Sequence, residues 1–130
     1  MRRIVTSDRL RTLIRFERQV RPSGIGKAGQ EKWERVAQVR AEVFDSLPSR
    51  STEKLEDGMM MAARQSRITI RWRPDITSDL RIVIGALDQP DSPPPTGRRI
   101  MRIVGGPAEL GRHDGLELMA QDTSTTGAGA

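Results

Sequence analysis

The sequence predicts an all-β protein, a small antiparallel β-barrel or sandwich of five to seven strands, with a long loop or a short helix between strands 2 and 3. Apolar and polar residues alternate over several short segments, which is the period of a strand with one buried face. Stretches rich in Gly and Pro separate these segments. The length of 130 residues corresponds to a single domain.

The first predicted strand lies within residues 11–20. Ile14 and Phe16 share one face of an extended chain, and Arg15 and Glu17 share the other. This alternation indicates a half-buried strand.

The next three segments are less regular. Residues 21–30 are rich in Pro and Gly and indicate a long hairpin loop. The apolar residues of segment 31–47 fit both a helical stripe and a strand, so periodicity alone leaves both structures open. Residues 49–65 are polar except for Leu55 and the run Met59–Met61. We expect a mobile loop or a frayed short helix there.

The second half of the chain contains four further predicted strands. In residues 67–73, Ile and Trp side chains alternate with Arg and Thr, which predicts one apolar face and one strongly cationic face. Residues 80–84 and 116–120 alternate in a similar way. Residues 99–104 are apolar on both faces apart from one arginine, as in a central strand.

Two Pro-containing segments are expected to interrupt these strands. Residues 88–97 hold four prolines, which cannot donate to a sheet, so this segment is predicted to be a stiff surface excursion. Gly105-Gly106-Pro107 is predicted to end the strand that precedes it.

The formal charge is +5, and 19 of the 22 basic residues are arginine. Residues 1–21 carry seven Arg against two acidic residues, a net +5, so the excess lies near the N-terminus. The small and polar residues at the C-terminus have nothing to bury. We therefore divide the chain into an N-terminal basic arm (1–9), a barrel domain (10–122) and a flexible tail (123–130).

The arginines of the predicted cationic strand are Arg67, Arg71 and Arg73. Guanidinium groups bind phosphate, but they also form bidentate pairs with carboxylates at protein interfaces. Because acidic residues are almost as numerous as basic ones, 17 against 22, we favour a protein interface.

No pattern typical of an enzyme stands out. Residues 24–29 spell GxGxxG, but the preceding segment is too polar for a buried parallel strand, so we interpret them as a flexible loop. The lone histidine, His113, is interpreted as a solvated loop residue, and the chain has no cysteine. Glu53, Glu56 and Asp57 are interpreted as a solvated face. We predict no catalytic, cofactor-binding or metal-binding residues and no cofactor.

No stretch approaches the roughly 18 to 20 consecutive apolar residues of a membrane span. The first residues are rich in arginine where a signal peptide has its apolar region. We expect a soluble, unexported protein without a membrane partner.

The order of strands and loops resembles the head-tail joining proteins, also called head-closure or head-tail adaptor proteins, of long-tailed bacteriophages and related gene transfer agents. The resemblance covers roughly residues 8–122. Residues 33–43 look like the family's tryptophan-valine-alanine strand, and residues 71–77 match its arginine-aromatic-arginine turn. The resemblance therefore favours a strand for the ambiguous segment. The chain departs from the family pattern at residues 88–97, a Pro-rich insertion, and at Met101, where the family usually has an aromatic residue.

The resemblance implies a virion protein that does no chemistry. It would assemble with itself as a ring of about 12 or 6 copies, with a head-to-tail contact between neighbours. The ring would lie under the portal or adaptor proteins and above the tail terminator or tail tube proteins. It would extend and close the channel through which double-stranded DNA passes without sequence-specific contacts. The chain would be made in the cytoplasm of a bacterial host and reside in the virion neck.

The resemblance also implies contact residues. In the family, the loop between the second and third strands reaches toward the neighbouring connector ring and orders on assembly; here it spans residues 46–65. The candidates for the neighbouring-ring contact are Leu55, Met59, Met60 and Met61, and those for the ring seam or lumen are Arg67, Arg71 and Arg73. The methionines could instead fill a gap in the core.

Other functions remain open. A tail-terminator or tail-completion ring is the nearest, because sequence alone separates it poorly from a head-closure ring. A basic nucleic-acid-binding β-barrel would bind duplex DNA with a steep dependence on salt. A nucleotide-using enzyme would place its ligand at residues 24–29.

Overall fold

The computed structural model describes residues 5–20, 32–46, 65–91 and 93–123. They form one short 3-10 helix and six strands: η1 (Ser7–Arg9), β1 (Thr12–Val20), β2 (Lys32–Ser46), β3 (Gln65–Arg71), β4 (Arg81–Ile84), β5 (Arg99–Leu110) and β6 (Gly115–Asp122).

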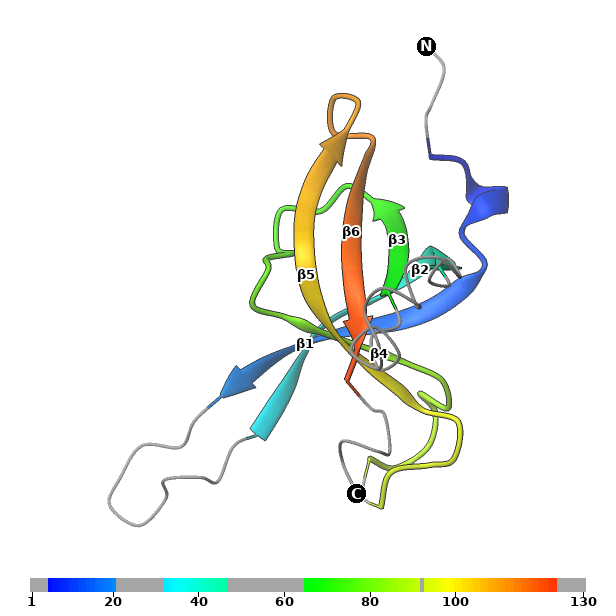
Figure 1. Cartoon of the computed structure of the whole chain (residues 1–130), viewed down its shortest axis with the longest axis vertical. Coiled ribbons are helices and arrows are strands. Elements are labelled where there is room, and N and C mark those ends of the chain that lie inside the picture. The colour runs from blue at the N-terminus through cyan, green and yellow to red at the C-terminus, as the bar shows by residue number, and fades with distance from the viewer. Residues whose placement is uncertain (1–4, 21–31, 47–64, 92, 124–130) are drawn as a thin grey trace, which may run out of the picture.

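The six strands close into a barrel in the order β1-β2-β3-β6-β5-β4. Every neighbouring pair is antiparallel, and the pairing of β1 with β4 completes the circle. In Figure 1, β5 and β6 run side by side along the body, while the hairpin ends of β1 and β2 project from it. The all-β barrel expected from the sequence is confirmed. No helix in the described segments is long and apolar enough to cross a membrane.

The core lies inside the barrel and receives alternate residues from each strand. Ile68 and Ile70 of β3 lie opposite Leu118 and Leu116 of β6, and all four side chains are buried. Phe16 is the one buried aromatic among the described residues. The core cluster consists of Ile14, Phe16, Ala41, Ile68, Ile70, Ile76, Leu80, Ile82, Met101, Leu116, Leu118 and Ala120.

The ambiguous segment is a strand, as the resemblance indicated. β2 pairs with β1 on one edge and with β3 on the other, and Val39 and Val43 pack against the core from its inner face. β-branched side chains fit such a pleated, half-buried surface. The register between β1 and β2 shifts at Phe16/Glu17, where a bulge lets the long hairpin curve around the barrel.

The expectation that Gly105-Gly106-Pro107 ends a strand is wrong. β5 continues to Leu110, with register irregularities between Ile103 and Gly105 and between Gly105 and Ala108. Gly106 has a φ of +84°, and a Cβ there would lie 2.7 Å from the backbone oxygen of Glu117. The glycine thus lets the strand bulge and continue instead of stopping.

The expected central strand also differs in burial. Met101 is fully buried, but Val104 is 43% exposed. β5 pairs with a strand on each edge, as a central strand does, yet beyond Met101 its outer face remains in solvent. Pairing on both edges therefore does not bury both faces in a single-layer barrel.

The prediction of a half-buried β1 is wrong at the middle of the strand, residues 14–17, where both faces are covered. Arg15 and Glu17 point away from the core, yet they are only 3% and 5% exposed. Arg15 Nη2 donates to the Leu87 carbonyl oxygen at 2.9 Å, so the connection between β4 and β5 lies over this face. The described part of that connection contains no strand, as its prolines predicted.

Five charged residues form the contact between β1 and this connection, and we call them the outer charge network: Arg15, Glu17, Arg81, Asp91 and Arg98. Glu17 accepts from Arg81 at 2.8 Å and from Arg15 at 3.3 Å. Asp91 accepts from Arg98 at 2.7 Å and from Arg15 at 3.3 Å. The hydrogen bond from Arg98, with a smaller contribution from Arg15, lowers the pKa of the Asp91 carboxyl below its ordinary value. The network holds the connection onto the barrel.

Part of the predicted N-terminal arm packs on the barrel. Val5 is fully buried, and its backbone N–H donates to Asp114 Oδ2 at 2.9 Å. A Cβ on Gly115 would lie 2.4 Å from a Val5 methyl carbon, so the glycine leaves the space that Val5 fills. The domain boundaries themselves stay predictions.

We predict that Glu17→Ala lowers the free energy of unfolding by about 3 kcal/mol, because it leaves the guanidinium of Arg15 buried with one counter-charge fewer. Chemical denaturation measures this loss. The control is Glu117→Ala, which removes an exposed partner 3.8 Å from Arg67 and should cost less than about 1 kcal/mol. Equal losses in the two variants would contradict a stabilising role for the outer charge network.

Candidate interaction surface

Arg67 lies on the outer face of β3. Its Nε is 3.8 Å from Glu117 Oε2, and its guanidinium carbon is 5.3 Å from the centre of the Phe44 ring. Phe44 is 57% exposed, the most exposed large apolar side chain among the described residues. Arg67 and Phe44 together form an outer patch in which a cation covers an aromatic face.

Arg71, at the end of β3, binds the N-terminal segment. Its Nη2 donates to Ser7 Oγ at 2.8 Å and its Nη1 to the Val5 carbonyl oxygen at 3.3 Å. Both acceptors are uncharged, so these bonds position the N-terminal segment without neutralising the guanidinium.

Arg73 follows the strand and forms a two-bond pair with Asp75. Its Nε and Nη2 each donate to one carboxylate oxygen at 2.9 Å. These bonds lower the pKa of the Asp75 carboxyl below its ordinary value of 3.8, with a smaller Coulomb contribution from the same guanidinium. The turn residues 73–75 are therefore held by a charge pair at the surface.

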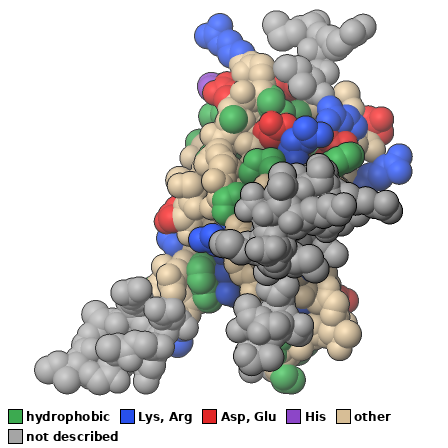
Figure 2. Space-filling model, in the orientation of Figure 1, with side chains coloured by type: hydrophobic (Ala, Val, Ile, Leu, Met, Phe, Trp, Pro, Cys, Tyr) green, Lys and Arg blue, Asp and Glu red, His purple; other side chains and the backbone are tan. Residues whose placement is uncertain are grey.

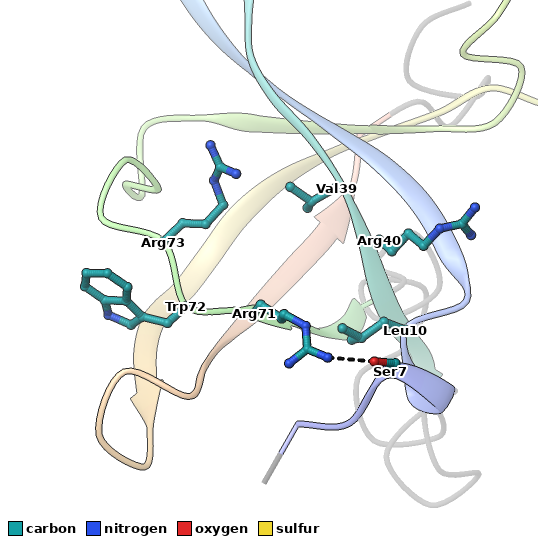
Figure 3. Close-up of a pocket in the computed structure, with 7 residues that line it drawn as sticks. All are labelled: Ser7, Leu10, Val39, Arg40, Arg71, Trp72 and Arg73. Atoms are coloured by element: carbon teal, nitrogen blue, oxygen red, sulfur yellow. Dashed lines mark hydrogen bonds between the residues drawn. The ribbon is translucent and has the colours of Figure 1, made fainter. Parts of the chain in front are cut away.

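Arg71 and Arg73 line one pocket, which we call the arginine pocket. Its cavity has a volume of about 350 Å³, and its lining residues are Ser7, Leu10, Val39, Arg40, Arg71, Trp72 and Arg73. Figure 3 shows Arg71 directed toward Ser7, and the guanidinium of Arg40 on the opposite side of the pocket from Trp72. Arg67 does not line this pocket, so the structure places the three predicted arginines in two separate surfaces.

The sequence analysis missed Ser7, Leu10, Val39 and Arg40 as parts of a site. They come from the N-terminal segment and from β2, far in sequence from residues 71–73. Only closure of the barrel and the bond from Arg71 to Ser7 bring them together. No local sequence signal marks such a junction.

A second cavity, of about 340 Å³, lies beside the outer charge network. Glu17, Trp33, Arg81, Asp91, Pro94, Arg98 and Ile100 line it. The guanidinium carbon of Arg81 is 4.0 Å from the centre of the Trp33 ring. The buried Nε of Arg15 has no hydrogen-bond partner among the described residues. The sequence analysis did not predict this site either.

His113 is exposed, as expected, but it is not isolated. Its ring stacks on Trp72 with 4.0 Å between the centroids and 24° between the planes. Its backbone N–H donates to Glu109 Oε2 at 2.6 Å. The stacking joins the β5–β6 turn to Trp72, which follows β3 and lines the arginine pocket.

Several predicted residues lie outside the described part of the chain. These are the ring-contact candidates Leu55, Met59, Met60 and Met61, and the glycine-rich residues 24–29. Within the described segments, no group of three or more His, Cys, Asp or Glu residues could hold a metal ion.

Basic and acidic side chains are interspersed on the face shown in Figure 2. This mixture agrees with the ion pairs at Arg67, Arg73 and Arg98. A protein that grips nucleic acid tightly typically presents a continuous basic stripe. On the face shown in Figure 2, the described basic side chains form no such continuous stripe.

The sequence model of the phage head completion proteins matches residues 6–123, nearly the whole described barrel. The chain belongs to this family. The resemblance drawn from the sequence is thereby confirmed, and phage head completion is a structural role in the virion. No curated protein sequence matches the chain significantly.

The barrel of this head completion protein is similar to a solved structure. The solution structure of protein SF1141 from Shigella flexneri 2a superposes with a TM-score of 0.61 and 23% identity, and the match covers 92% of this chain and 98% of that one. At this identity the likeness supports the fold alone.

For this head completion protein, we predict that the pKa of Asp75 lies below 3.8 in the folded state and returns toward its ordinary value in Arg73→Ala. Because folding depresses this pKa, the stabilisation is present above the unfolded value and is lost as the pH falls through the folded one. Carboxyl-carbon NMR titration measures both values. Asp79, whose pKa is lowered chiefly by the Thr77 hydroxyl, should not change in the variant. An unchanged Asp75 pKa would contradict the pairing.

Proposed function

We propose that this protein closes the phage head by assembling into a ring under the portal, where it extends the DNA channel and presents a docking surface to the tail. The observation that carries the proposal is the family match over residues 6–123 on a complete, closed barrel. The protein would lie at the neck of the virion, between portal or adaptor proteins and the tail proteins. A phage and a gene transfer agent would use it in the same way.

The closed barrel favours a seam made by side chains. All six strands pair within the barrel, and in the described structure one-sided pairing is confined to stretches of β1, β2 and β5 such as residues 32–40. A ring needs two different complementary patches on each copy. The Arg67–Phe44 patch and the arginine pocket are two different surfaces available for contacts with neighbours, one aromatic and exposed, the other hollow and cationic.

The contact with the adjoining ring is proposed for Leu55, Met59, Met60 and Met61. Methionine side chains are flexible and polarisable, and they adapt to irregular surfaces. In a segment that is otherwise polar, these apolar groups gain most when a partner covers them.

Weak contact with DNA fits this function. A channel must let DNA slide, so tight phosphate binding would oppose its passage. Arg67 and Arg73 already pair with carboxylates. These two arginines are therefore less available for phosphate.

We predict that a phage or gene transfer particle lacking this chain accumulates DNA-filled heads without tails. Electron microscopy of the particle necks, with the chain present and absent, makes the comparison. Supplying the wild-type chain from a plasmid should restore tailed particles. Tailed, intact particles in its absence would contradict the proposed function.

We also predict that amides of residues 55–61 exchange hydrogen more slowly in the assembled particle than in the free subunit, because the adjoining ring covers them. Hydrogen exchange with mass spectrometry compares the two states. The barrel segment 66–70 serves as the control, since its pairing is the same in both states. Equal exchange at residues 55–61 in the two states would rule out this contact.

A further inference from the structure

The arginine pocket combines an apolar lining with unbalanced positive charge. Leu10, Val39 and Trp72 supply the apolar part. Among its three arginines, only Arg73 has a carboxylate partner in the described structure. Arg71 binds the uncharged oxygens of Ser7 and Val5.

Arg40 adds a further charge without a counter-ion. It is exposed on the outer face of β2, opposite Leu13, and has no hydrogen bond or ion pair with any residue in the described segments. Two guanidinium groups of the pocket therefore lack a negative partner within the described part of the chain.

This chemistry fits an acidic protein segment with an apolar anchor. A cavity of about 350 Å³ accommodates an aliphatic side chain together with adjacent backbone. Carboxylates beside that anchor would reach the two guanidinium groups. A duplex phosphate backbone supplies the charge but no apolar group for the Leu10, Val39 and Trp72 surface.

The chain itself contains a segment of this composition. Residues 53–57 read Glu-Lys-Leu-Glu-Asp, which places one leucine among three carboxylates and one lysine. The sequence analysis interpreted these carboxylates as a solvated face, and the pocket offers them a partner.

We propose that residues 53–57 of one copy dock into the arginine pocket of the neighbouring copy, with Leu55 on the apolar lining and the flanking carboxylates on Arg40 and Arg71. The proposal rests on the ring assembly proposed above. It gives the seam a specific pair of surfaces. It also gives Leu55 a partner in the same ring, so that the contact with the adjoining ring falls to Met59, Met60 and Met61.

The attachment point of this segment and the pocket lie at opposite ends of β3. The segment between β2 and β3 starts from the Ser46–Gln65 pair, whereas the pocket lies at the Arg71 end of β3. At about 3.3 Å per residue these two ends of the strand are roughly 20 Å apart. A head-to-tail contact needs donor and acceptor surfaces at different places on the subunit, and this arrangement supplies them.

Peptide binding to the full chain tests the pocket. The probe is a synthetic peptide of residues 51–61, and the reporter is the fluorescence of Trp72 in a Trp33→Phe background. We expect saturable binding that weakens at least tenfold in Arg40→Glu. The matched control is Arg102→Glu, an exposed arginine on β5 without an ion pair in the described structure, which should bind as the parent does. Circular dichroism confirms that each variant is folded.

Two peptide variants separate the contributions of charge and apolar contact. Replacing Glu53, Glu56 and Asp57 by the corresponding amides should weaken binding at least tenfold, and so should Leu55→Ser. Equal binding by all peptides, or equal binding to Arg40→Glu and the parent, would overturn the proposal.

Mixed assembly distinguishes a neighbouring copy from the same chain. Arg40→Glu subunits and subunits with the three amide substitutions should each assemble poorly alone and better when mixed, because about a quarter of the junctions in an equal random mixture, and half of those in an alternating ring, combine an intact pocket with an intact segment. If mixing gives no gain, or if normal necks form from either variant alone, the docking proposal fails while the head-closure function stands. Absence of the wild-type chain from the neck would instead refute the proposed function.

Discussion

Closure of the barrel depends on β1, which pairs with β2 on one edge and with β4 on the other. The middle of this strand is covered on both faces, by the core on the inside and by the outer charge network on the outside. A slip of one residue in its register would turn Arg15 into the apolar interior and Ile14 out of it. Such a slip would cost both packing and charge pairing, so two unlike interactions specify the same register.

The surfaces available for assembly follow from this closure. Because most strand edges are used within the subunit, recognition by side chains on the outer face and at places where separate segments meet is favoured. The arginine pocket is such a place, at the junction of the N-terminal segment, β2 and the end of β3. The outer patch of Phe44 and Arg67 lies on the outer face. Membership in the phage head completion family gives both surfaces a context in which other virion proteins lie close by.

Sequence reasoning reached the fold class because the alternation of apolar and polar residues, as in segments 67–73 and 116–120, is a local property of the sequence. It failed where distant segments meet. Arg15 and Glu17 looked like a solvent face because nothing near them in the sequence shows that residues 87–91 return to cover them. Gly106 was interpreted as a stop because a glycine that ends a strand and one that permits a bulge have the same local sequence. The arginine pocket draws Arg40 from β2 and Arg71 from the end of β3, which only the barrel topology brings to one cavity.

Closure of the barrel also limits how free subunits can aggregate. Exposed strand edges are templates that recruit further chains into open-ended stacks. In the described structure such edges are confined to stretches of β1, β2 and β5 that pair on one side only, and the closed order of strands interrupts each of them. A second chain therefore meets short templates instead of a continuous edge along the whole sheet, which disfavours fibre growth.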